Sequence, residues 1–161
     1  EFNNSDKNRN TEDSKRGYIY TILNVFKNIM DVSLNIIKEC VNSNMFIESI
    51  THEISNVDDK IRVLALRLLV TLAYAEDDSC DKILLSLQDV SRKSGYRNRW
   101  NDIVKHIPTN TDKKIDFEYN MYTLSLINIV IGGLETIEER TDERRLLNSL
   151  KFDNKVNLIK N

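Results

Sequence analysis

Between Gly17 and Gly95 the chain contains neither a glycine nor a proline, and all 161 residues include one proline and four glycines. Folds built from β-strands need many such residues, because tight turns require their special backbone angles. Packed helices joined by short loops need few of them. The sequence therefore predicts an all-α fold, with helix in at least ~60% of the residues, which is well above the ordinary share.

Residues 60–75 and residues 117–131 are apolar on nearly every side of a helix, which is typical of helices buried between neighbours. Another helical pattern begins at Tyr18, and shorter amphipathic segments follow each long one. This recurrence favours an armadillo/HEAT-like right-handed helical solenoid, cut from a longer repeat array. A globular helix bundle is the alternative architecture. The apolar pattern predicts that five side chains are buried: Leu68, Leu69, Leu72, Leu126 and Ile127.

The first part of the chain differs in composition from the rest. Residues 1–16 are polar and rich in asparagine, with Phe2 as their one bulky apolar residue. Such a stretch buries too little surface to offset its ordering entropy, so we interpret it as a tail or linker. Residues 17–161 are interpreted as one armadillo-like repeat domain. The chain begins with Glu1 instead of methionine, which favours a fragment of a longer protein.

Several helix ends are marked in the sequence. Ser55 or Asn56 is expected to cap an apolar helix, and Asp58 and Asp59 are expected to present carboxylates to its first-turn amides. Thr136 and Glu139 have the spacing of a capping box. Gly95 is expected to end one helix, and Pro108 is expected to stop the next.

Signals for catalysis are poor. The sequence contains no dinucleotide-binding, phosphate-loop, zinc-protease or serine-hydrolase motif. His52 and His106 lie in separate amphipathic segments and are typical of solvated or core-edge side chains. Cys40 and Cys80 lack metal-ligand spacing, and we interpret them as buried thiols in a reducing compartment. We therefore expect no enzymatic activity, no cofactor and no metal site.

Charge and hydropathy argue against two classes of partner. The formal net charge is -2, whereas nucleic-acid-binding surfaces usually need a basic surplus or stripe. No apolar run approaches the roughly 20 residues that span a bilayer. The sequence predicts neither a nucleic-acid partner nor a membrane span.

Four segments together resemble a known family. The segment TLSLINIVIGG, followed by LETIEERTDERRLL, resembles the armadillo-repeat regulatory region of diaphanous-related formins. The segments ILNVFKNIMD, VLALRLLVTLAYAEDDSCDKILLSL and YRNRWNDIVKHI are similar to earlier parts of that region. The resemblance covers residues 18–161 in the family's order and spacing. Val32 and Lys151 replace glycines that are usual in the family, and Thr71 replaces a common alanine, which suggests a divergent member.

The resemblance implies a function and a binding surface. In this family the repeats form a concave groove that holds an amphipathic helix, the C-terminal autoregulatory segment of the same formin. Docking inhibits the actin-assembling domain until a Rho-family GTPase displaces the helix. Matching by residue, the groove would be lined by Asn28, Leu68, Thr71, Tyr74, Ala75, Leu124 and Asn128.

The resemblance also bears on partners and localisation. We expect only part of the Rho-family GTPase site in this chain, because the segment that completes the site precedes the repeats in the family. A cytoplasmic, cytoskeleton-associated protein is implied. The alternative is a generic armadillo-repeat adaptor, similar to engulfment scaffolds, that binds another protein.

Three polar residues in the last third of the chain are candidates for binding or structural roles. Asn128 lies inside an apolar helical stretch, so we expect a buried amide that either bonds a ligand backbone or clamps a neighbouring helix. Arg140 and Arg144 lie one helical turn apart. We interpret them as structural arginines that brace the last helices by pairing with Glu138, Asp142 or Glu143.

Overall fold

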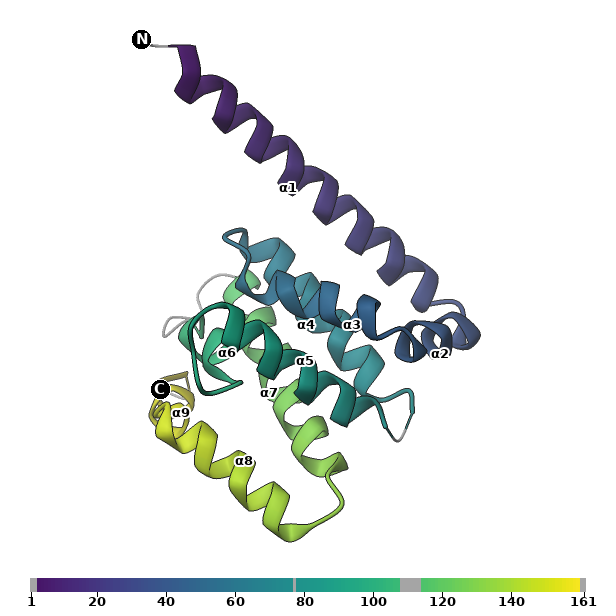
Figure 1. Ribbon diagram of the computed structural model, residues 1–161, viewed down its shortest axis with the longest axis vertical. Coiled ribbons are helices and arrows are strands. Elements are labelled where there is room, and N and C mark those ends of the chain that lie inside the picture. The colour runs from purple at the N-terminus through teal and green to yellow at the C-terminus, as the bar shows by residue number, and fades with distance from the viewer. Residues whose placement is uncertain (1–2, 77, 108–113, 160–161) are drawn as a thin grey trace.

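The computed structural model describes residues 3–76, 78–107 and 114–159, and it is built from helices (Figure 1). Helix makes up 82% of it, and no strand occurs among the described residues. The predicted all-α fold and its helix content are confirmed. Pro108 lies outside the described residues.

The long helices are α1 (Asn3–Met30), α4 (Asp59–Ala73) and α7 (Lys114–Gly133). After α1 come α2 (Leu34–Asn42) and α3 (Asn44–His52), which ends in a short 3-10 turn (Glu53–Ser55). After α4 come α5 (Ser79–Lys93) and α6 (Asn101–Lys105), and after α7 come α8 (Ile137–Ser149) and α9 (Phe152–Ile159). The predicted alternation of one long helix with shorter ones holds after α1 and α7 but not after α4, because α5 has 15 residues, as many as α4.

The three long helices lie in a row in chain order. Helix α1 packs against α4, and α4 makes its most extensive contact with α7. Helix α5 lies beside α3 and α7. The core follows this row, and all five side chains that were predicted to be buried are buried: Leu68, Leu69, Leu72, Leu126 and Ile127.

Helix α1 continues into the segment that we interpreted as a tail. It begins at Asn3 and runs through residue 16 without interruption, and its N-terminal half extends beyond the other helices (Figure 1). Adding residues to a helix that already exists is far easier than starting one. Arg16 lies 3.3 Å from Glu12 and 3.4 Å from Asp13, so local ion pairs accompany the extension. The boundary at residue 16 is therefore not a break in secondary structure.

The helix ends follow local chemistry. Asp58, and not Ser55 or Asn56, is the N-cap of α4, and its Oδ1 accepts a hydrogen bond from the Lys60 amide at 2.8 Å. Thr136 and Glu139 form both halves of the predicted capping box. Gly95 has a φ of 82° just after α5, and its N–H donates to the Arg92 carbonyl, as in a Schellman motif.

The turn between α8 and α9 depends on an unusual residue. Lys151 has a φ of 57°, in the left-handed region that favours glycine. By the formin resemblance, this is one of the two positions where a glycine was expected. The lysine accepts a strained backbone so that α9 can fold back against α8.

A buried polar cluster holds α8 against the segment before α6. Trp100 is fully buried, and its Nε1 donates to Glu143 Oε2 at 2.6 Å. Arg99 Nε lies 3.7 Å from the other oxygen of Glu143. Asn98 Nδ2 donates to the carbonyl of Leu146 at 2.7 Å. These contacts fix the position of α8, which forms one wall of the candidate site.

Candidate functional site

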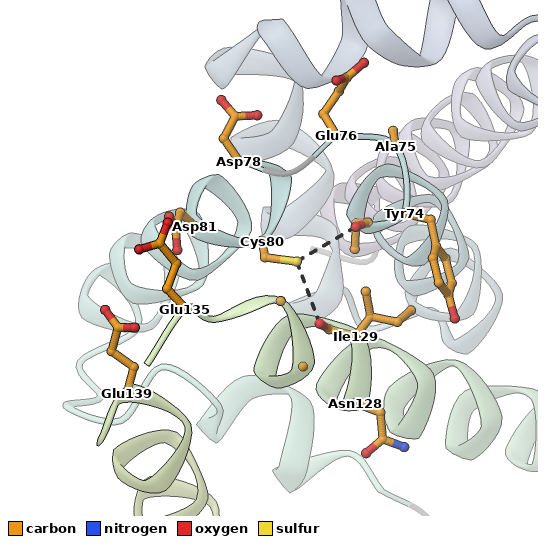
Figure 2. Close-up of a pocket in the computed structure, with 13 residues that line it drawn as sticks. Tyr74, Ala75, Glu76, Asp78, Cys80, Asp81, Asn128, Ile129, Glu135 and Glu139 are labelled. Carbon is orange, nitrogen blue, oxygen red and sulfur yellow. Dashed lines mark hydrogen bonds between the residues drawn. The ribbon is translucent and has the colours of Figure 1, made fainter. Parts of the chain in front are cut away.

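A hollow with a volume of about 1030 Å³ lies where α4 and α7 end and α5 begins (Figure 2). The loop from α7 to α8 closes one side of it. We call it the acidic depression. It is lined by Ala73, Tyr74, Ala75, Glu76, Asp78, Cys80, Asp81, Asn128, Ile129, Gly132, Gly133, Glu135 and Glu139.

The rim of the acidic depression carries carboxylates and no lysine or arginine. Glu76 pairs with Lys38 at 3.1 Å, and Asp78 pairs with Lys82 at 2.8 Å. The remaining rim carboxylates belong to Asp81, Glu135 and Glu139.

These three rim carboxylates are not equally available. Hydrogen bonds from the Thr136 amide and hydroxyl hold the pKa of Glu139 below its ordinary value, so this carboxylate is committed to the cap. Asp81 and Glu135 are exposed and have no ion pair among the described residues. They are the carboxylates left free for a ligand.

The floor of the acidic depression is made by a close approach of α5 to α7. Cys80 Sγ lies 3.8 Å from the carbonyls of Ala73 and Ile129 (Figure 2). A Cβ atom at Gly133 would lie 2.7 Å from that sulfur, so a side chain there would push the helices apart. Burial raises the pKa of the Cys80 thiol, which keeps it protonated and a poor nucleophile. Both Cys80 and Cys40 are free buried thiols, as predicted.

Three of the seven predicted groove residues line the acidic depression: Tyr74, Ala75 and Asn128. Tyr74 projects into solvent with 74% of its surface exposed. Its ring is therefore free to contact a partner.

The other four predicted groove residues lie elsewhere. Leu68 is 1% exposed and belongs to the core, because it faces inward from α4. Leu124 packs partly against that core. Thr71 is half-buried and donates to the Arg67 carbonyl at 3.1 Å. Asn28 lies on α1, where its Oδ1 accepts from Lys27 Nζ at 3.0 Å.

The expectation that Asn128 is a buried amide is wrong. Asn128 is exposed, and none of the interactions of the described residues clamps its side chain to another helix. The buried amide of α7 is Asn120, with 4% of its surface exposed and neither amide atom hydrogen-bonded. Sequence pattern alone did not separate the two asparagines, since apolar residues flank both along the chain.

The expected pairing of Arg140 and Arg144 with carboxylates is also wrong. Arg140 donates from Nε to the Leu134 carbonyl at 2.9 Å and from Nη2 to the Glu135 carbonyl at 3.3 Å. It therefore holds the α7–α8 loop through backbone oxygens. Arg144 is exposed and has no ion pair in the described part of the chain.

The carboxylates that were expected to pair with Arg140 and Arg144 either contact other residues or make no ion pair among the described residues. Glu143 is buried against Trp100, and Asp142 pairs with Arg145 at 2.8 Å. Glu138 is exposed. Sequence spacing identified helical neighbours, but it could not indicate which of them turn inward.

A second hollow of about 360 Å³ lies between α7, α8 and α9. We call it the arginine depression. It shares Asn128 and Gly132 with the acidic depression, so the two adjoin on α7. Its lining is Ile127, Asn128, Ile131, Gly132, Arg140, Arg144, Leu147, Asn148, Phe152 and Asp153.

Three further observations concern metal ions, membranes and titratable groups. No group of three or more His, Cys, Asp or Glu side chains among the described residues could hold a metal ion. No helix in the described ranges is long and apolar enough to cross a membrane. Burial, together with nearby Arg62 and Lys105, lowers the pKa of His106 to about 4. At neutral pH that imidazole is uncharged, and it lies away from both depressions.

The site is therefore a pair of adjoining depressions that carry opposite charges, and it lies at the ends of α4 and α7.

Comparison with protein-family models, with curated proteins and with solved structures finds no match to this chain.

Proposed function

We propose that this chain is a non-enzymatic binding module that holds a basic amphipathic helix in its acidic depression. We further propose that its row of long helices belongs to an armadillo/HEAT-like right-handed solenoid. The order α1–α4–α7 supports this, because stacked repeats bring each long helix against the next.

The observation that carries the proposal is the make-up of the acidic depression. Its floor is apolar or small, from Ala73, Ile129 and the two glycines, while its rim has the unpaired carboxylates of Asp81 and Glu135. An amphipathic helix presents apolar anchors at i, i+3, i+4 and i+7, which suits such a floor. Lysines or arginines beside those anchors would face the rim. Charge complementarity of this kind speeds association and selects the partner.

The resemblance to diaphanous-related formins suggests which helix is bound. In that family the occupant is the C-terminal autoregulatory segment of the same protein, and a Rho-family GTPase releases it to permit actin assembly. We propose this role, in association with the cytoskeleton, for the present chain. The generic armadillo-repeat adaptor remains the alternative, and its occupant would come from another protein.

The test is a titration with a fluorescently labelled peptide from the C-terminal tail of the parent protein, followed by anisotropy. Asp81→Lys and Glu135→Lys each replace an unpaired carboxylate with a repelling charge. Each variant should weaken binding about tenfold or more, which corresponds to ~1.4 kcal/mol. The matched control is Glu39→Lys, an exposed carboxylate on α2 far from the depression in sequence and not part of its lining.

Thermal melts should show that all three variants stay folded. Equal affinities for the two rim variants and the wild-type protein would place the binding surface elsewhere. A tail peptide that does not bind, beside a basic helix from another protein that does, would favour the adaptor.

A further inference from the structure

We infer that the arginine depression is a second subsite, which binds a carboxylate-bearing residue of the same segment that occupies the acidic depression. This inference rests on the proposed function. It adds a requirement for the ligand: a basic portion and an acidic portion on either side of the Asn128–Gly132 junction.

Two guanidinium groups face the arginine depression. Arg140 and Arg144 are four residues apart on α8, so they project from one face about 6 Å apart along the helix axis. Arg140 uses Nε and Nη2 for backbone carbonyls, which leaves Nη1 available. Arg144 has no ion pair among the described residues. An arginine with a free planar group is well suited to a carboxylate, which it can bind through two hydrogen bonds.

Much of the rest of the lining is apolar. Ile127, Ile131, Leu147 and Phe152 are each at most 9% exposed, so they form a closed surface below the opening. One acidic residue, Asp153, also lines the depression, but it makes no ion pair with either arginine in the described structure. A free inorganic anion would leave the apolar wall unused. A side-chain carboxylate next to a bulky apolar residue would use both parts.

The second subsite adjoins the first on α7. The two depressions share Asn128 and Gly132, which are neighbours one helical turn apart on α7. On one side of this junction the free charges are the carboxylates of Asp81 and Glu135, and on the other side they are the two arginines together with the single carboxylate of Asp153. A helix lying across the junction would meet a reversal of charge. A ligand charged oppositely at its two ends would therefore be preferred over one that is only basic.

The experiment is a double-mutant cycle with two synthetic helical peptides and anisotropy detection. The first peptide has lysines at one end, an apolar i, i+3, i+4, i+7 face, and glutamates at the other end. The second is identical except that glutamine replaces each glutamate. The protein variants are Arg144→Gln and Arg145→Gln. Arg145 is the matched control because it adjoins Arg144, pairs with Asp142 and lies outside the depression.

The wild-type protein should bind the glutamate peptide about tenfold more tightly than the glutamine peptide. Arg144→Gln should abolish that preference, whereas Arg145→Gln should retain it. Coupling between the two changes, not the loss from either one, identifies the contact. Arg140 is left unchanged because it holds the loop.

The experiment separates failure of the second subsite from failure of the proposed function. Equal binding of the two peptides by the wild-type protein, with Asp81→Lys weakening both, would overturn the second subsite and leave the acidic depression intact. Absence of binding by either peptide, or insensitivity to Asp81→Lys, would overturn the proposed function as well.

Discussion

Asn120 and Asn128 are the same residue type on one helix, about two turns apart, and their surroundings are opposite. Asn120 is buried with its amide unsatisfied, while Asn128 lies at the junction of two open depressions. The difference teaches that a helix apolar on nearly every side does not reveal its inward face. On α7 that face is chosen by the contact with α4.

The largest expected effect tests the inward face itself. Leu126 has no exposed surface, whereas Met121 on the same helix is 40% exposed. Leu126→Ala should lower the free energy of unfolding by about 2–5 kcal/mol, because it removes buried methyl groups and leaves a cavity. Met121→Ala should stay within ~0.5 kcal/mol. Chemical denaturation measures both, and equal losses would mean that the two faces are wrongly assigned.

The next test concerns the two asparagines directly. Asn120→Leu replaces a buried amide that lacks partners with an apolar group of similar shape. The free energy of unfolding should rise by about 1–3 kcal/mol, since the cost of desolvating the amide is removed. Asn128→Leu, at the open surface, should change it by less than ~0.5 kcal/mol. A loss of stability in Asn120→Leu would reveal that the amide has a partner, such as a buried water.

The sequence does not tell which face of α7 points inward, although much of the fold can be predicted from it. The capping box of Thr136 and Glu139 and the stop at Gly95 depend on neighbours within a few residues, so spacing alone predicted them. Helix content and the buried leucines followed from apolar periodicity for the same reason. The cap of α4 was expected at Ser55 or Asn56 and lies at Asp58, because several neighbouring residues there are of types that can cap a helix.

The site depends on contacts between residues far apart in the chain, and sequence spacing does not report these. The acidic depression joins residues from the ends of α4 and α7 with others from α5 and the α7–α8 loop. Tyr74, Ala75 and Asn128 were anticipated only through the formin resemblance. Asp81 and Glu135 were missed, because carboxylates at helix starts are usually explained by capping. What distinguishes them is the lack of any partner, which only the packed structure reveals.

The smallest expected effect is a dependence of folding stability on pH, and it arises from His106, which lies at the edge of the inward face of α7. His106 lies beside Tyr119 of α7 and Arg62 of α4 in a small hollow. Burial, Arg62 and Lys105 lower its pKa to about 4 in the folded protein, from an ordinary value of 6.5. The unfolded chain therefore binds more protons between these values, and folding stability falls as the pH drops from about 6.5 towards 4.

The measurement is a series of denaturation curves between pH 7.5 and pH 4 for the wild-type protein and for His106→Gln, chosen to span roughly both pKa values. The substitution should flatten the slope over this interval. Because His106 is only half-buried, the change should be modest, since solvent screens its charge. An unchanged slope would assign the pH dependence to the carboxylates instead.

Trp100 gives the molecule an optical reporter of its own. It is the single tryptophan of the chain, fully enclosed, and its indole N–H donates to Glu143 on α8. Tryptophan emission responds to water and to hydrogen bonding at the indole ring. If α8 moved away from the segment before α6, the indole would lose that bond and meet solvent, and its emission would shift to longer wavelength. Since α8 also carries Arg140 and Arg144, the same signal would follow any ligand that moves this wall, without an attached dye.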